Sequence, residues 1–280
     1  MIGQESLLNA IRKQIKDDTF PHFTILVGDK GSGKKTLAGE IKKMLNIMTY
    51  HIPDVKMENI RWLIEEAYKT KVPALYIIQD ADEMSVNAKN ALLKVTEEPP
   101  NNAYFLMTLE NENNTLPTIR SRGTIYHMDT YSKDEIEAYE VEKYFDDNST
   151  ELSIVHDLCD NLGEVDLLHK MEVQNFYNYV QLTVDNIATV SGANCFKIAN
   201  KIAFKDDEVN GDKYDLKMFW KAFCSVCRFE ARKSDNVDDA QYYINGCLLT
   251  SNYIKDLRIK SVNKQMLFDH WILAIRRLWM

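Results

Sequence analysis

Residues 28–36 match a phosphate-binding loop in which one metal ligand is replaced. They read Gly-Asp-Lys-Gly-Ser-Gly-Lys-Lys-Thr. A P-loop has the pattern G-x-x-x-x-G-K-[ST], in which backbone N–H groups and the lysine bind phosphates and the hydroxyl binds Mg²⁺. Gly28, Gly33 and Lys34 fit this pattern, whereas Lys35 stands where the hydroxyl belongs. The mismatch predicts the shape of a nucleotide site with impaired metal chemistry.

The sequence leaves open whether this loop still holds a nucleotide. Lys34 and the loop amides could bind phosphate, with Lys35 partly replacing Mg²⁺. Alternatively, Lys35 could occupy the pocket and exclude nucleotide. We expect weak binding of ATP, ADP or phosphate, or none, no required cofactor, and no hydrolysis by the isolated chain. The residues of this candidate site are Gly28, Gly31, Gly33, Lys34, Lys35 and Thr36.

Catalysis would also need a buried strand that ends in two acids, which hold Mg²⁺ and position the attacking water. Residues 74–78 form an uninterrupted apolar run typical of such a strand. Gln79 and Asp80 follow it, although a neutral amide is a poor ligand for a hard dication. Asp82 and Glu83 come too late to lie at the strand tip. The sequence therefore predicts a degenerate Walker B site at Gln79 and Asp80.

The elements around the loop have the order that a P-loop requires. Residues 23–27 are a short apolar run that ends at Gly28, and residues 37–45 have helical spacing. This order favours a true P-loop over a chance glycine-rich turn. All six prolines lie within the first 117 residues, so the remainder lacks strong helix breakers. We expect an α/β front and an all-helical back, with helices at residues 214–232, 240–259 and 264–279.

Length and charge limit the class of protein. A chain of 280 residues with 45% hydrophobic residues can bury a substantial core and has room for two or three domains. No apolar run is long enough for a membrane span, and the N-terminal end lacks a signal-peptide core, so we expect a cytoplasmic protein. Residues 129–170 carry 3 basic and 13 acidic side chains. This segment would repel a phosphate backbone and is not expected to bind nucleic acid.

The five cysteines all lie past the midpoint of the chain. Their odd number does not suggest a disulfide framework. Cys224 and Cys227 form the one C-x-x-C pair, inside a stretch with helical spacing. We interpret these two as buried thiols on a helix face rather than as a zinc or redox site.

Three further segments are the most specific in the chain. Residues 90–100 read Asn-Ala-Leu-Leu-Lys-Val-Thr-Glu-Glu-Pro-Pro, a helix stopped by a double proline, and residues 103–108 form another strand. Residues 116–122 read Leu-Pro-Thr-Ile-Arg-Ser-Arg. Together with Ile-Gly-Gln-Glu at residues 2–5 and the P-loop, these segments resemble the AAA+ subunits of sliding-clamp loaders. They are most similar to the delta-prime subunits of bacterial DNA polymerase III. Beyond about residue 130 the resemblance rests on helical pattern and length.

The resemblance implies a RecA-like AAA+ domain at residues 1–128, with a parallel sheet between helices. It also implies a small helical lid at residues 129–187 and an all-α collar at residues 188–280 that joins a five-membered ring. In this family a Ser-Arg pair inserts its arginine into the neighbouring subunit's ATP site, where a guanidinium stabilises charge on the transferred phosphoryl group. By position this arginine is Arg122. A simpler alternative is that Arg120 and Arg122 only pair with carboxylates at a helix start.

Three departures from the family pattern matter. Gly123 stands where a cysteine usually follows Ser-Arg, and residues 37–74 lack the cysteines of a zinc module that bacterial relatives often carry. We therefore expect no zinc and no other bound metal. The lid position of a sensing arginine falls at residues 161–164, which offer no cation. These losses predict a subunit that has stopped hydrolysing ATP.

The function implied by the resemblance is that of a non-hydrolysing, delta-prime-like subunit of the DNA polymerase III clamp loader. Such a subunit scaffolds the ring and supplies Arg122 in trans, so that the sliding clamp is loaded during DNA replication. The expected partners are gamma/tau-like motor and delta-like subunits and, through the ring, the sliding clamp and primer–template DNA. One alternative is an ATP-hydrolysing gamma/tau-like motor subunit that uses Asp80 and Thr36 in shifted roles. Another is a stand-alone P-loop NTPase, in which Arg122 has no partner site.

Overall fold

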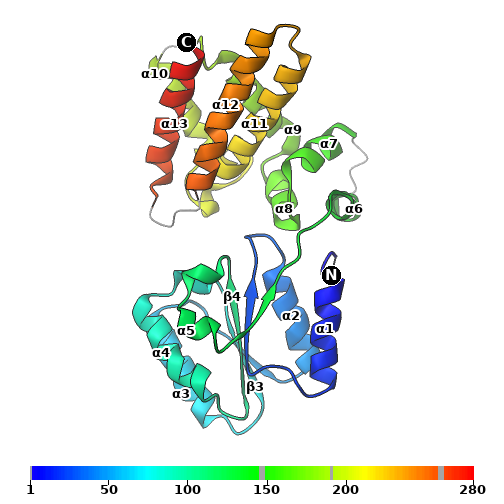
Figure 1. Ribbon diagram of the computed structural model, residues 1–280, viewed down its shortest axis with the longest axis vertical. Helices are drawn as coiled ribbons and strands as arrows, with labels where there is room; N and C mark the ends of the chain where they lie inside the picture. The colour runs from blue at the N-terminus through cyan, green and yellow to red at the C-terminus, as the bar shows by residue number, and fades with distance from the viewer. Residues whose placement is uncertain (1, 145–148, 190–191, 258–261) are drawn as a thin grey trace. The chain divides into compact units, whose positions relative to one another are not determined.

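The computed structural model describes residues 2–144, 149–189, 192–257 and 262–280. The chain divides into two compact units (Figure 1). The first unit comprises Met1–Glu135 and Asn161–Gly163, and the second comprises Ile136–Asp160 and Glu164–Met280. Separate lid and collar domains remain a prediction. Among the described helices, none combines the length and apolar character that a membrane crossing requires.

The first unit is built on a five-stranded parallel sheet with the strand order β2-β3-β4-β1-β5. Its strands are β1 (Phe23–Val27), β2 (Met48–His51), β3 (Ala74–Ile78), β4 (Ala103–Leu109) and β5 (Thr124–His127). In the central register, Ile25 of β1 lies opposite Met107 of β4 and Ile125 of β5. The predicted α/β fold with a parallel sheet is confirmed.

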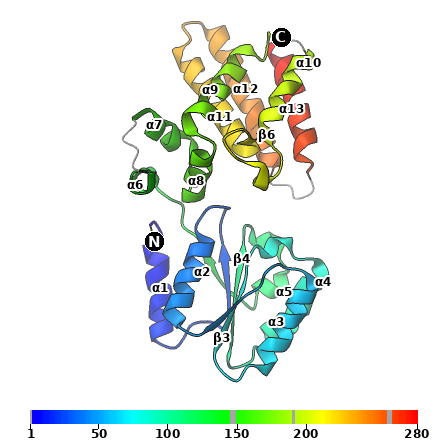
Figure 2. The same ribbon diagram turned by 180° about the vertical axis from the view of Figure 1, so that it is seen from behind.

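Helices cover both faces of this sheet (Figures 1 and 2). Helices α1 (Glu5–Lys16) and α2 (Lys34–Leu45) lie on one face, and α3 (Met57–Lys69), α4 (Val86–Glu97) and the short α5 (Pro117–Arg120) lie on the other. Alternate strand residues enter two separate cores, as the period of two in a strand requires. Ile25 packs with the residues of α3 and α4, whereas Leu26 packs with those of α1 and α2. Because both faces are covered, the inner strands β1, β3 and β4 are buried and mainly apolar, whereas the edge strands β2 and β5 are partly exposed.

The second unit is mainly helical. Its helices, with α6 beginning in the first unit, are α6 (Lys133–Tyr144), α7 (Ser149–Leu158), α8 (Leu162–Lys170), α9 (Val173–Asn186), α10 (Gly192–Cys195), α11 (Leu216–Lys233), α12 (Val237–Asp256) and α13 (Lys264–Trp279). Fully buried aromatic side chains hold α11 and α13 together, with the rings of Phe223 and Trp271 5.1 Å apart. The predicted helix at residues 264–279 has the observed bounds of α13.

One segment of this unit differs from the helical expectation. Strands β6 (Ile202–Ala203) and β7 (Tyr214–Asp215) form a small parallel pair, with the short turn η4 (Asp206–Glu208) between them. The connecting residues are rich in Asp, Asn and Gly, which favour turns over helix. The Asp215 carboxylate also accepts a hydrogen bond from the Met218 N–H at 2.8 Å, which caps α11. The absence of prolines after residue 117 could not predict this break in the helical region. Helix α11 begins at Leu216, two residues later than expected.

Candidate nucleotide site and arginine loop

Residues 28–33 connect β1 to α2, so the strand, loop and helix follow in the predicted order. Gly31 and Gly33 have φ angles of 87° and 89°, in the left-handed region that favours glycine. Gly33 caps the start of α2, whose first N–H groups are free of intrahelical partners and suited to an anion. Thr36 lies exposed in the first turn of α2. The backbone of the loop is therefore that of a phosphate site.

The lysine that would bind phosphates is engaged with the loop itself. Lys34 is buried, and its Nζ donates hydrogen bonds to the carbonyl oxygens of Gly28 at 2.5 Å and Asp29 at 2.9 Å. Burial lowers the pKa of Lys34, although carboxylates at Glu110 and Asp82 act in the opposite direction. A phosphate would have to displace these two carbonyl contacts to reach the ammonium group.

Lys35 meets the acid at the end of the neighbouring strand. Its Nζ lies 2.9 Å from Asp80 Oδ2, and the two side chains are 61% and 50% exposed. The Asp80 N–H donates to Thr108 Oγ1 at 3.0 Å, which fixes Asp80 at the tip of β3 in a left-handed conformation with a φ of 51°. The residue that stands in place of the Mg²⁺-binding hydroxyl is thus joined by an ion pair to Asp80, the acid at the position that would orient the attacking water.

The other acids and the amide near β3 do not complete a metal site in the described residues. Gln79 follows the strand and is half-buried. The Asp82 carboxylate is buried and accepts hydrogen bonds from the Glu110 N–H at 2.7 Å, the Asn111 N–H at 3.2 Å and Asn114 Nδ2 at 2.9 Å. It therefore holds the loop that follows β4. Across the described part of the chain, no group of three or more His, Cys, Asp or Glu residues could hold a metal ion.

A segment from far along the chain lies directly against the P-loop. The Gly163 N–H donates to the Gly31 carbonyl oxygen at 3.2 Å, and residues 161–163 belong to the first compact unit. A Cβ atom at Gly31 would collide with the Asn161 side chain, and one at Gly163 would collide with the Gly31 backbone. Two glycines therefore permit backbone-to-backbone contact at the position where the family resemblance implies a sensing arginine. The contact between Gly163 and Gly31 could not be predicted, because no spacing or motif in the sequence links the two residues.

Glu164, the acid at the same lid position, is used within the helical unit. Its carboxylate oxygens lie 2.8 Å from Lys217 Nζ and 2.9 Å from Lys221 Nζ. Although burial raises the pKa of Glu164, these two ammonium groups bring it below the ordinary value. The acid is a partner of α11 rather than a free group.

Both arginines of the loop at residues 116–122 contact acids. Arg122 donates from Nη1 to the Thr118 carbonyl oxygen at 2.6 Å and from Nη2 to Glu97 Oε1 at 2.5 Å. Arg120 donates to Asn113 Oδ1 at 2.9 Å and lies 3.8 Å from Glu112. These contacts are those of the simpler alternative, in which the arginines pair with carboxylates. The Arg122 and Glu97 side chains are nevertheless 30% and 51% exposed, and such pairs contribute little to stability.

Gly123 has a packing reason of its own. A Cβ atom there would lie 2.7 Å from Ile25 Cδ1 and 2.8 Å from Phe23 Cδ1, both on β1. The space that a cysteine would need is filled by these side chains. The departure from the family pattern is therefore accommodated locally, beside an arginine that is retained.

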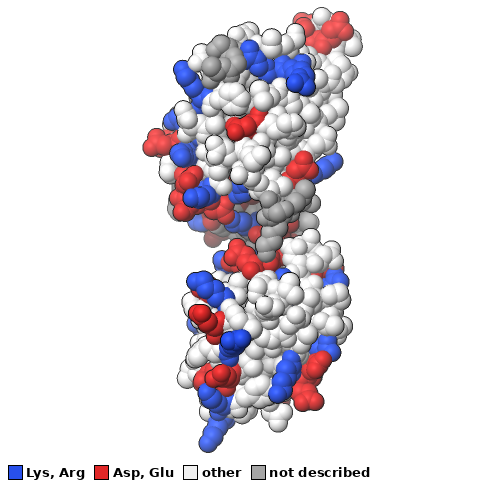
Figure 3. Space-filling model, turned by 90° about the vertical axis from the view of Figure 1, so that its left-hand side faces the viewer, with Lys and Arg blue, Asp and Glu red and all other residues white. Residues whose placement is uncertain are grey.

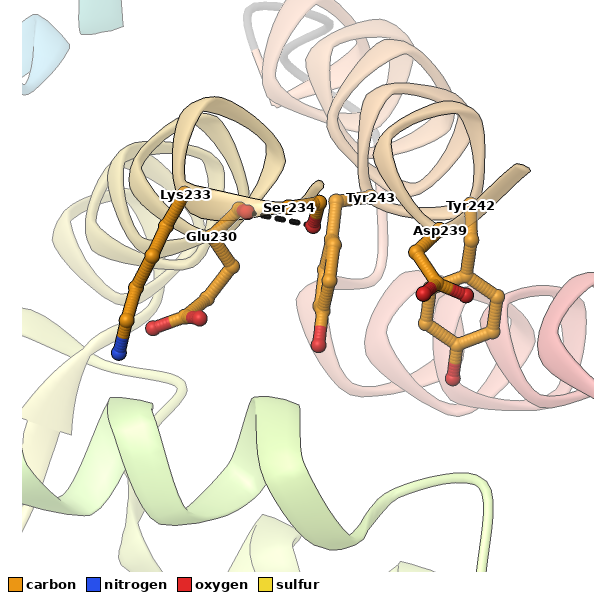
Figure 4. Close-up of a pocket in the computed structure, with 6 residues that line it drawn as sticks. All are labelled: Glu230, Lys233, Ser234, Asp239, Tyr242 and Tyr243. Carbon is orange, nitrogen blue, oxygen red and sulfur yellow. Dashed lines mark hydrogen bonds between the residues drawn. The ribbon is translucent and has the colours of Figure 1, made fainter. Parts of the chain in front are cut away.

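One pocket lies in the second unit, and none of the residues that line it was predicted to form a site. It has a volume of about 430 Å³ and lies where α11 ends and α12 begins (Figure 4). Its lining residues are Glu230, Lys233, Ser234, Asp239, Tyr242 and Tyr243. On the face shown in Figure 3, basic and acidic side chains are interspersed over both units, without a broad basic patch.

Comparison with known proteins gives the family context. The model of the family described as "DNA polymerase III, delta subunit" matches residues 45–132. The delta-prime subunit of DNA polymerase III from Bacillus subtilis is 30% identical over 149 residues, which cover 42% of this chain and 45% of that protein. The chain is related to the clamp-loader subunits of DNA polymerase III. This relationship confirms the family resemblance of the motifs.

Gamma and tau subunits of DNA polymerase III match the chain over a similar length. The gamma subunit of Buchnera aphidicola (subspecies Schizaphis graminum) is 27% identical over 166 residues, covering 49% of this chain and 46% of that protein. The Escherichia coli tau subunit is 27% identical over 166 residues, covering 49% and 26%. The matches thus span less than half the length of these curated relatives. A gamma subunit-related protein of Thermotoga maritima shares the fold, with a TM-score of 0.50, 14% identity, and coverage of 98% and 99%.

Proposed function

We propose that the chain is a non-hydrolysing, delta-prime-like subunit of the DNA polymerase III clamp loader. It scaffolds the ring and supplies Arg122 to the ATP site of a neighbouring gamma/tau-like motor subunit. Its other partners are a delta-like subunit and, through the assembled ring, the sliding clamp and primer–template DNA. It acts in the cytoplasm, binds no zinc, and binds ATP, ADP or phosphate weakly if at all.

The ion pair between Lys35 and Asp80 carries this proposal. Mg²⁺ in a P-loop site needs oxygen ligands, whereas an ammonium group offers three donors and no acceptor. Lys35 therefore removes one ligand, repels the dication and pairs with Asp80, the one acid directly at the end of β3. Lys34 adds to this effect because its ammonium group already donates to Gly28 and Asp29.

The scaffold role is supported by apolar side chains on the last two helices. Residues spaced by seven and four positions share one face of a helix. The exposed residues with this spacing are Val237, Ile244 and Leu248 on α12, and Met266 and Leu273 on α13. Exposed apolar faces of this kind are typical of surfaces that contact another protein. We assign them to the ring contacts of the proposed collar.

An ATP-hydrolysing gamma/tau-like motor is the second candidate, because several of the matched relatives are gamma and tau subunits. Under this alternative, Thr36 and Asp80 would bind Mg²⁺ in shifted positions. Thr36 is exposed at the start of α2, as such a role requires. Lys35 would have to leave Asp80 for the site to form.

ATP hydrolysis by the purified chain, and by rings whose motor subunits lack a functional P-loop, separates the two candidates. We expect the wild-type chain and Lys34→Ala to show the same background rate in both settings. Steady-state hydrolysis that Lys34→Ala removes would overturn the proposal and favour the motor. The assay includes the ring because a P-loop site can need an arginine from a neighbouring subunit, so a motor could be inactive when isolated.

A further inference from the structure

Where α11 and α12 pack side by side (Figures 1 and 2), the Cys224 side chain contacts the residue Cys247. Cys224 lies in α11 and Cys247 lies in α12. Cys224 Sγ is 3.5 Å from the Cys247 carbonyl oxygen and 3.9 Å from Ser251 Oγ. The Ser251 hydroxyl donates to the same carbonyl oxygen at 2.8 Å. The two thiols are also close enough that each shifts the pKa of the other.

The two thiols differ in accessibility. Cys224 is buried, whereas Cys247 is partly exposed. Cys227, one turn along α11 from Cys224, is buried as well. Cys247 is therefore the more accessible of the two neighbouring cysteines. An accessible thiol beside a second thiol is the arrangement of an oxidisable cysteine and a resolving cysteine.

The surroundings of the three thiols shift their pKa values in opposite directions. Contact with the Cys224 thiol lowers the pKa of Cys247, and the nearby Arg228 guanidinium adds to this effect, whereas burial acts in the opposite direction. Contact with Cys247 and burial raise the pKa of Cys224, and burial raises that of Cys227. The thiolate is the reactive form of cysteine, so we assign Cys247, which is the more accessible thiol and has the lowered pKa, as the nucleophile.

We propose that Cys247 and Cys224 form a peroxide-sensitive pair that closes to a disulfide between α11 and α12. The Cys247 thiolate attacks one oxygen of hydrogen peroxide, the O–O bond breaks, and hydroxide leaves and is protonated to water. The Cys224 sulfur then attacks the sulfur of the Cys247 sulfenic acid. The S–S bond forms, and the oxygen leaves as water with the Cys224 proton. Two thiols are oxidised and one peroxide is reduced to two waters, and a dithiol reductant reverses the reaction.

Peptide mapping of the folded, full-length chain tests this proposal. The protein is treated with equimolar hydrogen peroxide, alkylated with iodoacetamide and digested. We expect a linked peptide that contains Cys224 and Cys247, which dithiothreitol removes. Cys227→Ser should still form the link, and Cys224→Ser should leave Cys247 as a sulfenic acid that dimedone labels. Cys247→Ser should leave Cys224 reduced.

Several results would overturn the proposal. They are a Cys247 that stays reduced, a Cys247 that is oxidised to the sulfinic acid without a link, and a link that involves Cys227, Cys159 or Cys195. Circular dichroism before and after oxidation shows whether the helices remain folded. The wild-type map needs no substitution, so a variant that fails to fold does not remove the test.

Discussion

Two ion pairs in the first unit each join a cation to a carboxylate, but they differ in what they imply for nucleotide and metal binding. Lys35 meets Asp80 at the nucleotide loop, and Arg122 meets Glu97 at the arginine loop. The Lys35 ammonium replaces a metal ligand and cannot itself bind Mg²⁺. The Arg122 guanidinium has five N–H donors, of which its contacts with Thr118 and Glu97 use two. The Lys35–Asp80 pair therefore places a cation where a metal ligand would be needed, whereas the Arg122–Glu97 pair leaves guanidinium donors for a further acceptor.

The two acids after β3 provide the sharpest contrast in stability. Asp82 is buried and accepts three hydrogen bonds, so Asp82→Asn should lower the free energy of unfolding by about 2 kcal/mol. Asp80→Asn removes only an exposed ion pair and should cost less than about 1 kcal/mol. Urea unfolding of both variants measures the difference. Equal losses would show that Asp80 is structural and that the contrast drawn here is wrong.

The contact of Gly31 with residues 161–163 should also affect stability. Gly31→Ala should destabilise the fold by about 1 to 2 kcal/mol, because φ is positive and a Cβ meets Asn161. Gly39→Ala is the matched control, since a Cβ there meets nothing within 4 Å and alanine favours helix by about 0.5 to 1 kcal/mol. Thermal unfolding compares the two. A neutral Gly31→Ala would mean that residues 161–163 do not pack against the P-loop.

Restoring the missing hydroxyl should partly restore metal-dependent binding. Lys35→Ser removes the cation from Asp80 and returns an oxygen ligand, so MgATP should bind about tenfold more tightly, a gain of roughly 1.4 kcal/mol. Calorimetry with Mg²⁺ and with EDTA checks this, because the gain should appear only with the metal. Hydrolysis should stay absent because Gln79 is not an acid. A gain that persists in EDTA would mean that Lys35 only blocks the pocket.

The smallest effect should come from the partner of Arg122. Glu97→Gln keeps an acceptor and removes a charge from an exposed pair, so ring hydrolysis should change by no more than about fivefold. The neighbouring Glu98→Gln is the control. A loss as large as that caused by removing Arg122 would show that Glu97 is required to hold the arginine in place.

Much of the first unit could be predicted from its apolar runs. The strands at residues 23–27 and 74–78 were predicted with their observed bounds because strands buried on both faces leave continuous apolar segments. The P-loop was predicted from glycines that its left-handed backbone requires. Boundaries set by capping side chains were harder, as α12 shows: it begins at Val237, three residues earlier than expected, after the capping residue Asn236.

Contacts between distant parts of the chain could not be predicted. Glu97 belongs to a segment that the sequence singled out, yet nothing in its spacing pointed to Arg122. The approach of Gly163 to Gly31 depends on tertiary packing over 132 residues of separation. The meeting of Cys224 with Cys247 likewise follows from how α11 and α12 pack, because periodicity identifies the face of a helix but not its neighbour.

The most direct test of the central claim compares Arg122→Ala with Lys34→Ala in the same reconstituted ring. If the chain supplies an arginine and performs no hydrolysis, Arg122→Ala should slow ATP hydrolysis at the neighbouring site by about 10³-fold or more. Lys34→Ala should leave the rate of the ring within about twofold of wild type, since its P-loop would do no chemistry. The account would be contradicted by the reverse result, in which Lys34→Ala slows the ring and Arg122→Ala does not.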